Sequence, residues 1–422
     1  MKYLSLSKYS FAVIGTFILF SPNILAKTTL TDILQHAFVA DPTLDEAKAN
    51  IAMAASQTKV SEAGHLPVVS LTGTQVLSQQ HRYTSERRSG PGVAARVNLY
   101  AWGGIEAEIE RDKHKQTYYQ HKLTETQEVM GQDIAQLYLM ALRAKETIAI
   151  YKESLQRHEK ILKNLGVIAS FDEGRYSEVN EALSRKNQVE TTILMQERIM
   201  QSALNRLSRY SQKVLSVSDL VDPFNQVNVH QFIERYKNPE VKNNPSYLAQ
   251  QAEFNSSRAA VEAAKARRLP AINLEGSASR HEREVYVNMS WDIYNPATKY
   301  AEQQSYYSQK AAEAKLREIE LSVQEKSLTS ETDMIRNQKL ASVAKKQIAL
   351  QRKVVSDNEL QFEVAARSLI DLLNSYQELT RIQIDEVTAR NDFRDAALAY
   401  LASQARITNW VGIENSPKSK HK

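Results

Sequence analysis

The sequence has no cysteine and little glycine or proline. Its 422 residues include 12 glycines, 10 prolines and no cysteine. Without cysteine the chain can form no disulfide framework, no thiol nucleophile, no cysteine-based zinc site and no lipidated cysteine of the bacterial lipoprotein type. Because glycine and proline interrupt helices, their scarcity predicts a chain dominated by α-helix, most of all over residues 297–411, where neither occurs.

Signatures of catalysis and of nucleic-acid binding are also missing. The sequence contains no P-loop, no Gly-x-Ser-x-Gly and no His-Glu-x-x-His motif. The formal net charge of +5 is small for this length and argues against a nucleic-acid partner. His114 and His121 share one face of a predicted helix, but two histidines without a third ligand are more typical of solvated surface than of a metal site. The sequence therefore predicts no enzyme, no catalytic residue, no metal site and no cofactor.

Residues 1–26 have the pattern of a secretory signal peptide. Lys2 and Lys8 form a basic start, residues 11–20 form an apolar core, and Ala26 is a small residue before the cleavage point. The core is shorter than the roughly 20 apolar residues of a membrane-spanning helix, although an uncleaved anchor remains the alternative. No later stretch is hydrophobic enough for a transmembrane helix. An exported chain of this kind is soluble in the periplasm, secreted, or inserted as a β-barrel.

Two very long helices are predicted. From Met130 to Leu165 the apolar positions alternate steps of three and four, which is the heptad seam of a coiled coil, and His158 is its only clearly polar member. This seam lies in residues 103–170, which would form a rod of about 100 Å, and a second rod is predicted at residues 297–361. Shorter helices are predicted at residues 31–64, 176–208 and 368–407. Laid end to end, the first two match the first rod in length, which describes a two-layer wall with strands at one end only.

Four segments with a period of two adjoin the rods. The alternation is untidy at residues 68–78 and regular at 93–100, 272–279 and 285–293. When tilted, such segments can cross a thin outer membrane, with apolar faces toward lipid and polar faces toward a wet lumen. The alternative is an antiparallel sheet that covers a soluble core. Since outer-membrane barrels need at least about eight strands, four spanning strands require an oligomer.

Individual strand residues are assigned to each surface. The residues expected to face lipid are Val97, Leu274, Val287 and Met289. The residues expected to line the barrel lumen are Arg96, Asn98, Asn273, Glu275 and Asn288. The aromatic residues at strand ends, where interfacial girdles occur, are Tyr100, Trp102, Trp291 and Tyr294.

Repeated motifs predict that the two halves of the chain arose by internal duplication. Asp41-Pro-Thr-Leu44 recurs as Asn244-Pro-Ser-Tyr247, and His65-Leu-Pro67 recurs as Arg268-Leu-Pro270 at the same offset. The predicted organisation is a signal peptide (1–26), a first repeat (27–208), a connector or equatorial region (209–238), a second repeat (239–411) and a flexible tail (412–422). Each repeat is predicted to contain a helix, two strands, a long helix and a helix.

This arrangement resembles the TolC family of outer-membrane channels over nearly all of the mature chain. The turn Phe362-Glu-Val-Ala-Ala-Arg-Ser-Leu-Ile-Asp-Leu-Leu-Asn374 is similar to the family's second turn and departs from it at Ala365, Ser368 and Asn374. The resemblance implies a mainly α-helical fold with a membrane β-barrel part. It further implies a homotrimer, in which a twelve-stranded barrel continues as an α-helical tunnel across the periplasm.

The resemblance also implies a gate at the periplasmic tip. The gate residues carried over from the family are Ser177, Glu178, Phe362, Arg367, Asp371 and Asn374. An ion pair between Arg367 and Glu178 is expected, and three copies of Asp371 would form an acidic ring. The alternative for Asp371 is that it caps a helix or pairs on the surface. Phe362 stands where many relatives have tyrosine, and Asn374 replaces a second acidic ring.

Two short segments are most similar to the type I secretion branch, whose members export large adhesins. They are Asn98-Leu-Tyr-Ala-Trp-Gly-Gly104 and Leu142-Arg-Ala-Lys-Glu146. The implied function is an outer-membrane exit duct that passes an unfolded exported protein. Its partners would be an inner-membrane ABC transporter, a periplasmic membrane-fusion adaptor and outer-membrane lipid, in a Gram-negative bacterium. The alternatives are the outer-membrane channel of a tripartite drug efflux pump and a soluble periplasmic coiled-coil scaffold.

Overall fold

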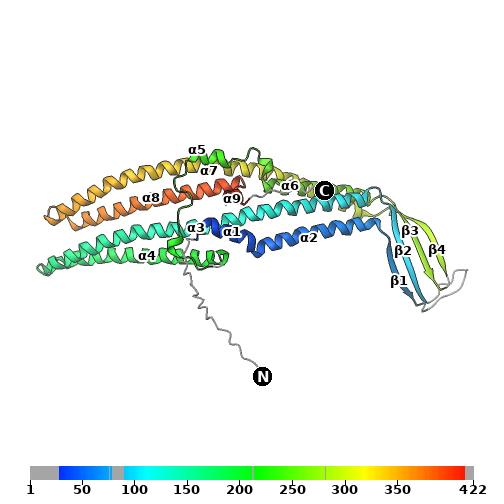
Figure 1. Ribbon diagram of the computed structural model, residues 1–422, viewed down its shortest axis with the longest axis horizontal. Helices are drawn as coiled ribbons and strands as arrows, with labels where there is room; N and C mark the ends of the chain where they lie inside the picture. The colour runs from blue at the N-terminus through cyan, green and yellow to red at the C-terminus, as the bar shows by residue number, and fades with distance from the viewer. Residues whose placement is uncertain (1–27, 76, 78–89, 212, 281, 414–422) are drawn as a thin grey trace, which may run out of the picture.

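The protein is an elongated stack of helices with a small sheet at one end. The computed structural model describes residues 28–75, 77, 90–211, 213–280 and 282–413, so the predicted signal peptide and the tail from 414 lie outside them. The long helices α3 (Gly104–Ala169) and α7 (Pro296–Glu363) extend from the sheet to the far end of the molecule (Figure 1). Their 66 and 68 residues confirm the two predicted rods.

Shorter helices lie end to end along each long helix. α2 (Pro42–Glu62) and α4 (Tyr176–Ser211) pack on α3, while α6 (Pro245–Ala266) and α8 (Leu369–Ser403) pack on α7. α6 and α8 also contact α3. The order across the layer is therefore α2 with α4, then α3, then α6 with α8, then α7. Among the described elements, α7 forms one outer edge of this layer, and α2 with α4 forms the other.

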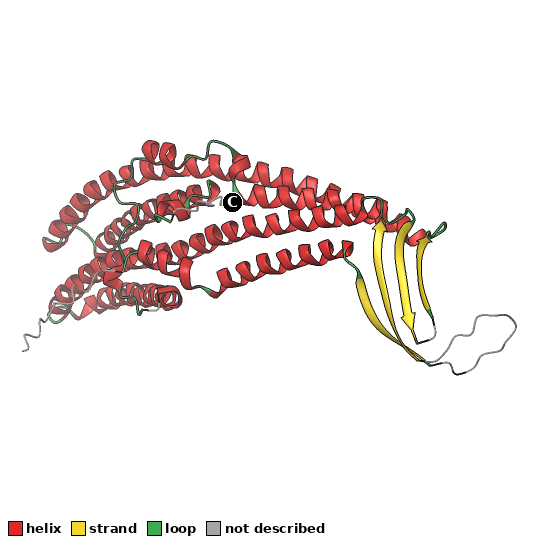
Figure 2. Ribbon diagram, turned by 45° about the vertical axis from the view of Figure 1, so that its right-hand side comes forward, coloured by secondary structure: helices red, strands yellow, loops and turns green. Residues whose placement is uncertain are grey.

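The strands form one antiparallel sheet in the order β1-β2-β3-β4. They are β1 (Val68–Thr74), β2 (Gly90–Tyr100), β3 (Ala271–Ser279) and β4 (Arg283–Ser290). β2 pairs with β3, so the sheet joins the two halves of the chain. Figure 2 shows that the strands extend beyond the ends of the helices.

The order of elements repeats along the chain, and so does the start of one helix in each half. Asp41 caps α2 by accepting a hydrogen bond from the backbone N–H of Thr43 at 2.9 Å, and Asn244 caps α6 by accepting one from Ser246 at 2.9 Å. Each cap precedes a proline at the first helical position. A backbone N–H at this position has no acceptor within the helix, so proline costs no hydrogen bond there. These matching caps support the internal duplication, whose boundaries remain a prediction.

The single helix predicted at residues 31–64 is wrong, because the chain breaks at Asp41. Helix α1 (Leu30–Ala40) ends there, since Pro42 has no backbone N–H and its ring clashes with a preceding helical turn. Asp41 then starts α2, which is a separate helix.

Two predicted boundaries in the second half of the chain also need correction. The connector predicted at residues 209–238, where no helix was expected, contains helix α5 (Val229–Tyr236), which is capped by Asn228 and buries three of its apolar side chains. The last long helix ends at Ser403, short of residue 407, and a single turn, α9 (Ile407–Trp410), follows it.

Two buried apolar clusters hold the helices together. The larger joins α1, the middle of α3, the connector and the end of α8, and the smaller lies where α3, α4, α7 and α8 approach their far ends. The predicted seam of α3 is confirmed, since Ile134, Ala141, Ala144, His158 and Leu165 are all buried. No helix in the described part of the chain is long and apolar enough to cross a bilayer.

Candidate functional site

One face of the sheet carries polar side chains that meet across the strands. Arg96, Glu275 and Tyr286 lie opposite one another on β2, β3 and β4. Glu275 accepts hydrogen bonds from Tyr286 Oη at 3.0 Å and from Asn288 Nδ2 at 3.4 Å, and its Oε1 lies 4.0 Å from Arg96 Nε. Directly opposed residues point to the same face of a sheet, so this row forms one continuous polar surface.

The remaining predicted lumen residues extend this polar surface toward the helices. Asn98 Nδ2 donates to Asn273 Oδ1 at 3.0 Å, and Asn288 lies opposite Asn273 on the next strand. The structure thus brings all five predicted lumen residues onto one face. A hollow at this end of the sheet, bordered by Gly64 and by Ile105 of α3, is lined by four of them.

The opposite face of the sheet is apolar and uncovered. Val285, Val287 and Met289 expose 61–76% of their surface. Val97 and Leu274 share this face but are half-buried, because they lie on the two inner strands between neighbours. The alternative in which the sheet covers a core of its own chain is therefore wrong for the described residues.

All four predicted girdle residues lie where the sheet meets the helices. Trp102 Nε1 and Trp291 Nε1 donate to backbone carbonyls at 2.6 and 3.1 Å, while both rings stay about half exposed. The Tyr100 ring packs edge-on against Trp102 with centroids 5.0 Å apart, and Tyr294 is 88% exposed. Exposed rings with satisfied polar atoms suit a boundary between an apolar and a wet environment.

The two helical hairpins end together, far from the sheet (Figure 1). On the first hairpin Ser177 is exposed, and Glu178 accepts a hydrogen bond from Arg175 at 2.8 Å. The predicted ion pair between Arg367 and Glu178 is not formed within the chain. The reason is local: Arg175 lies three residues before Glu178 on the same face and forms an ion pair with its carboxylate.

The second hairpin holds the other predicted gate residues. Arg367 donates to the side-chain oxygen of Asn358. Ser368 accepts from the backbone N–H of Asp371 at 3.2 Å and donates to its Oδ2 at 2.8 Å, so Asp371 takes part in the cap of α8, as in the alternative interpretation. Asp371 and Asn374 are both exposed, one turn apart on α8.

Phe362 lies in the core of the tip instead of on its open surface. It is buried in the last turn of α7 together with Leu165, Leu369 and Leu372. Its ring therefore stabilises the hairpin, and the structure does not bring it to the exposed side chains of the proposed gate.

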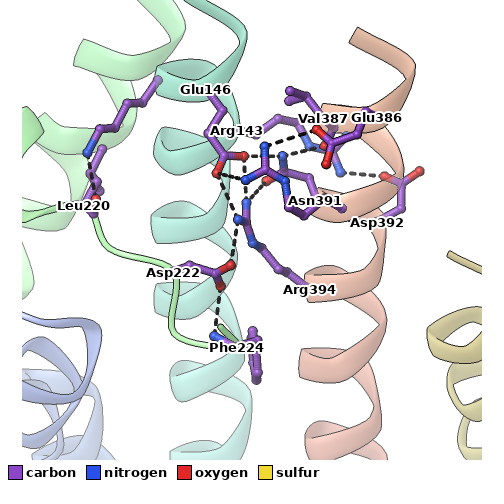
Figure 3. Close-up of polar contacts among 12 residues, drawn as sticks. Arg143, Glu146, Leu220, Asp222, Phe224, Glu386, Val387, Asn391, Asp392 and Arg394 are labelled. Carbon is purple, nitrogen blue, oxygen red and sulfur yellow. Dashed lines mark hydrogen bonds and ion pairs between the residues drawn. The ribbon is translucent and has the colours of Figure 1, made fainter. Parts of the chain in front are cut away.

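A buried ion network links the two halves of the chain to the connector (Figure 3). Arg394 of α8 donates to both carboxylate oxygens of Glu146 of α3, at 2.8 and 2.9 Å, and to Asp222 of the connector at 2.7 Å. Arg390 and Asn391 also donate to Glu146, at 3.1 and 2.9 Å. Burial by itself lowers the pKa of Arg394, but hydrogen bonds to the two carboxylates outweigh it and raise the pKa. The guanidinium therefore keeps its charge.

The segment Leu142–Glu146, which supported the resemblance to the secretion branch, is part of this network. Arg143 donates to Asp392 at 2.6 Å and to Asp395 at 2.9 Å, and Lys145 donates to the backbone oxygen of Leu220 at 2.8 Å. Its charged residues thus fasten α3 to α8 and to the connector. Sequence analysis missed the network because its members are up to 252 positions apart. The available signal was a set of charged residues at core-facing helical positions.

The described residues contain no group of three or more His, Cys, Asp or Glu side chains that could hold an ion. His114 Nε2 lies 3.5 Å from Glu110, while burial lowers the pKa of His121.

Comparisons with known proteins agree with this geometry. Residues 33–211 match the family model described as outer membrane efflux protein. No curated protein is similar enough in sequence to match the chain. Among solved structures, the outer-membrane channel OprN is 16% identical with a TM-score of 0.74, and the similarity covers 89% of each chain.

Two further structures are similar at low identity. The outer membrane protein VceC of Vibrio cholerae is 14% identical with a TM-score of 0.71, over 89% of this chain and 96% of that one. The CmeC outer membrane channel of Campylobacter jejuni is 12% identical with a TM-score of 0.73, over 89% of this chain and 85% of that one. Residues 33–211 of the chain are therefore similar to outer membrane efflux proteins, and over 89% of its length the chain has the TolC-like fold of these channel structures.

Proposed function

We propose that three copies of this chain close into a continuous duct through the outer membrane and the periplasm. The observation that carries the proposal is the layer of helices with two open edges. On the α7 edge, Leu340, Val343, Leu350 and Val354 fall at heptad positions and expose 45–65% of their surface. The exposed apolar residues of the α4 edge are Leu183, Leu194, Met195 and Ile199. A second copy supplies the complementary edge, and this head-to-tail contact closes into a ring.

The sheet gives the proposed duct its outer-membrane part. In this arrangement each protomer supplies four strands of a twelve-stranded barrel, with the apolar face toward outer-membrane lipid. The polar row of Arg96, Glu275 and Asn288, together with Asn98 and Asn273, lines the lumen. The exposed aromatic rings at the base of the sheet lie at the membrane boundary.

The far end of the helices is proposed to be the periplasmic mouth. Three protomers would place six hairpin ends around one opening, with Ser177, Glu178, Arg367, Asp371 and Asn374 on exposed surface near it. An adaptor protein and an inner-membrane transporter would meet the duct at this end.

Within the family we propose the type I secretion role, in which the duct passes an unfolded protein from an ABC transporter. Support comes from the likeness of Asn98–Gly104 and of Leu142–Glu146 to that branch. The efflux of small toxic compounds is the second candidate, supported by the family description matched by residues 33–211. The two functions share one architecture and differ in cargo.

Cysteine cross-linking tests the ring directly, because the natural chain contains no cysteine. Leu194 and Val343 lie at similar distances along their helices from the tip and belong to opposite edges of the layer. The variant with Leu194→Cys and Val343→Cys should give covalent trimers on a non-reducing gel, and each single variant should give none. A double variant that stays monomeric under oxidation would reject this edge-to-edge contact.

Gene deletion tests the cargo. Loss of the secretion duct should leave a large exported protein trapped inside the cell while its synthesis continues. If deletion changes only the resistance to small toxic compounds, the efflux function is correct and the secretion function is rejected.

A further inference from the structure

Beside the smaller apolar cluster, the two coiled coils near the tip also meet through polar side chains. One coil is α3 with α4, the other is α7 with α8, and α3 contacts α8 between them. Ser154 of α3 and Thr380 of α8 are joined by a hydrogen bond of 3.0 Å, and Gln383 donates to Glu153 at 2.9 Å. Polar contacts such as these can be exchanged for contacts with water when the coils separate.

His158 is buried inside this contact. It is 4% exposed, and its Nδ1 lies 2.8 Å from the backbone oxygen of Ser154. A carbonyl oxygen can only accept, so Nδ1 carries the proton of the neutral ring. The ring edge packs against Tyr376 of α8 with centroids 5.8 Å apart. Burial is the main cause that lowers the pKa of His158, so the ring is neutral at neutral pH.

The charges around His158 oppose a second positive charge. Arg157 of α3 and Arg185 of α4 both act against the imidazolium. From α7, Glu359 accepts a hydrogen bond from Tyr376 at 2.7 Å and lies 3.6 Å from the ammonium of Lys160. Arg352 of α7 and Glu153 of α3 form a pair at 3.5 Å, and Glu181 holds Arg185 at 3.0 Å. The α8 partners in this contact, Tyr376, Thr380 and Gln383, are neutral side chains. The carboxylates of Glu153, Glu181 and Glu359 thus already have partners.

We propose that this contact is a proton-controlled joint, in which protonation of His158 separates the α3/α4 coil from the α7/α8 coil within each protomer. The separated state exposes His158 to water and binds the proton more tightly than the closed state. The closed state is therefore fully favoured above the ordinary histidine pKa of about 6.5 and weakens as the pH falls below it. The opening constant should rise by up to about tenfold for each pH unit in that window, until the pKa of the buried ring is passed.

The joint is a property of the folded chain. Only its use in opening or closing the periplasmic tip rests on the proposed duct. Hydrogen exchange on the purified full-length protein in detergent tests it without any transport assay. Opening constants are measured at pH 7.5 and 5.5 for peptides covering residues 150–162 and 374–384, after correction for the intrinsic exchange rate at each pH. The wild type should open at least fivefold more at pH 5.5 in these two peptides, while peptides of the larger core change little.

Matched variants separate His158 from other titrating groups. His158→Gln keeps a neutral side chain that can donate and should abolish the pH dependence, whereas His114→Gln on the same helix should retain it. An unchanged pH dependence in His158→Gln, or no dependence in the wild type, would overturn the proposal.

A disulfide lock provides a test in which His158 itself is kept. The variant Ser154→Cys with Thr380→Cys places two thiols across the contact. In the oxidised form the pH-dependent opening should disappear, and reduction should restore it. If the oxidised variant still opens at pH 5.5, the exchange reports another motion and the joint is rejected.

Discussion

Replacing Arg394 by leucine should loosen the middle of the molecule far more than replacing Arg143 by leucine. Both arginines belong to the same α3–α8 contact, and each binds two carboxylates at 2.6–2.9 Å. Their burial differs, because the side chain of Arg394 is 1% exposed and that of Arg143 is 39% exposed. The comparison therefore isolates the effect of burial on an ion pair.

The expected magnitudes follow from what each substitution leaves behind. Removing one partner of a buried ion pair costs roughly 3–5 kcal/mol, because the other charge remains poorly solvated. Glu146 keeps Arg390 and Asn391 as donors, so we expect a value near the lower end, about 3 kcal/mol, or roughly a 150-fold rise in the local opening constant. An exposed pair contributes about 0–1 kcal/mol, so Arg143→Leu should raise the opening constant by no more than about fivefold.

Hydrogen exchange of the full-length protein measures both effects. The informative peptides cover residues 214–227 of the connector and 387–398 of α8. Raising the ionic strength should shrink the effect of Arg143→Leu, since exposed charges are screened, and should leave that of Arg394→Leu nearly unchanged. Arg394→Lys should fall between them, because it keeps the charge but loses the two-pronged geometry toward Glu146.

The reasoning would be refuted by equal effects of the two leucine variants, or by less than a fivefold effect of Arg394→Leu. In that case the network would be dispensable, and apolar packing of the larger core would hold the connector by itself.

Three further predictions concern the sheet and the tip. Val287→Arg should lower the yield of heat-modifiable oligomer on gels, because arginine facing lipid near the bilayer centre costs roughly 2–4 kcal/mol, whereas Asn288→Arg on the polar face should be tolerated; equal damage would reject the face assignment. Ala365 has a φ of 55°, so Ala365→Gly should stabilise the α7–α8 turn by about 1 kcal/mol, seen as slower exchange of that turn, and an unchanged rate would mean that the turn is unstrained. In planar bilayers Arg367→Ser should raise single-channel conductance and Asp371→Ala should lower cation selectivity; two unchanged channels would place the gate elsewhere.

The long helices and the faces of the strands could be predicted from the sequence because both depend on local spacing. A run such as Ile134, Ala141 and Ala144 has one register that buries it, so periodicity fixes the helix and its buried face. Strand alternation likewise assigned Arg96 and Glu275 to one face before their pairing was known. These features need no knowledge of which partner covers the surface.

Local signals were present but misread where two interpretations competed. Asp41-Pro42, like Asn244-Pro245, signals the start of a helix. A proline can also lie within the first turns of one longer helix, which is what the prediction of a single helix at residues 31–64 assumed. The short helix α5 was missed because residues 209–244 contain two prolines and lack a long periodic run. Phe362 was assigned from the family's turn motif, whereas the packing of the hairpin decides that it is buried.

Only the tertiary structure decided which polar groups meet. Arg394 finds Glu146 and Asp222 from 248 and 172 positions away, and His158 becomes a buried base only because α8 closes over it with Tyr376. A side chain's charge and burial depend on every element packed around it, including elements distant in the chain. Periodicity in the sequence predicts that a surface will be covered. The fold determines which groups cover it, and those groups determine the energy of a buried charge.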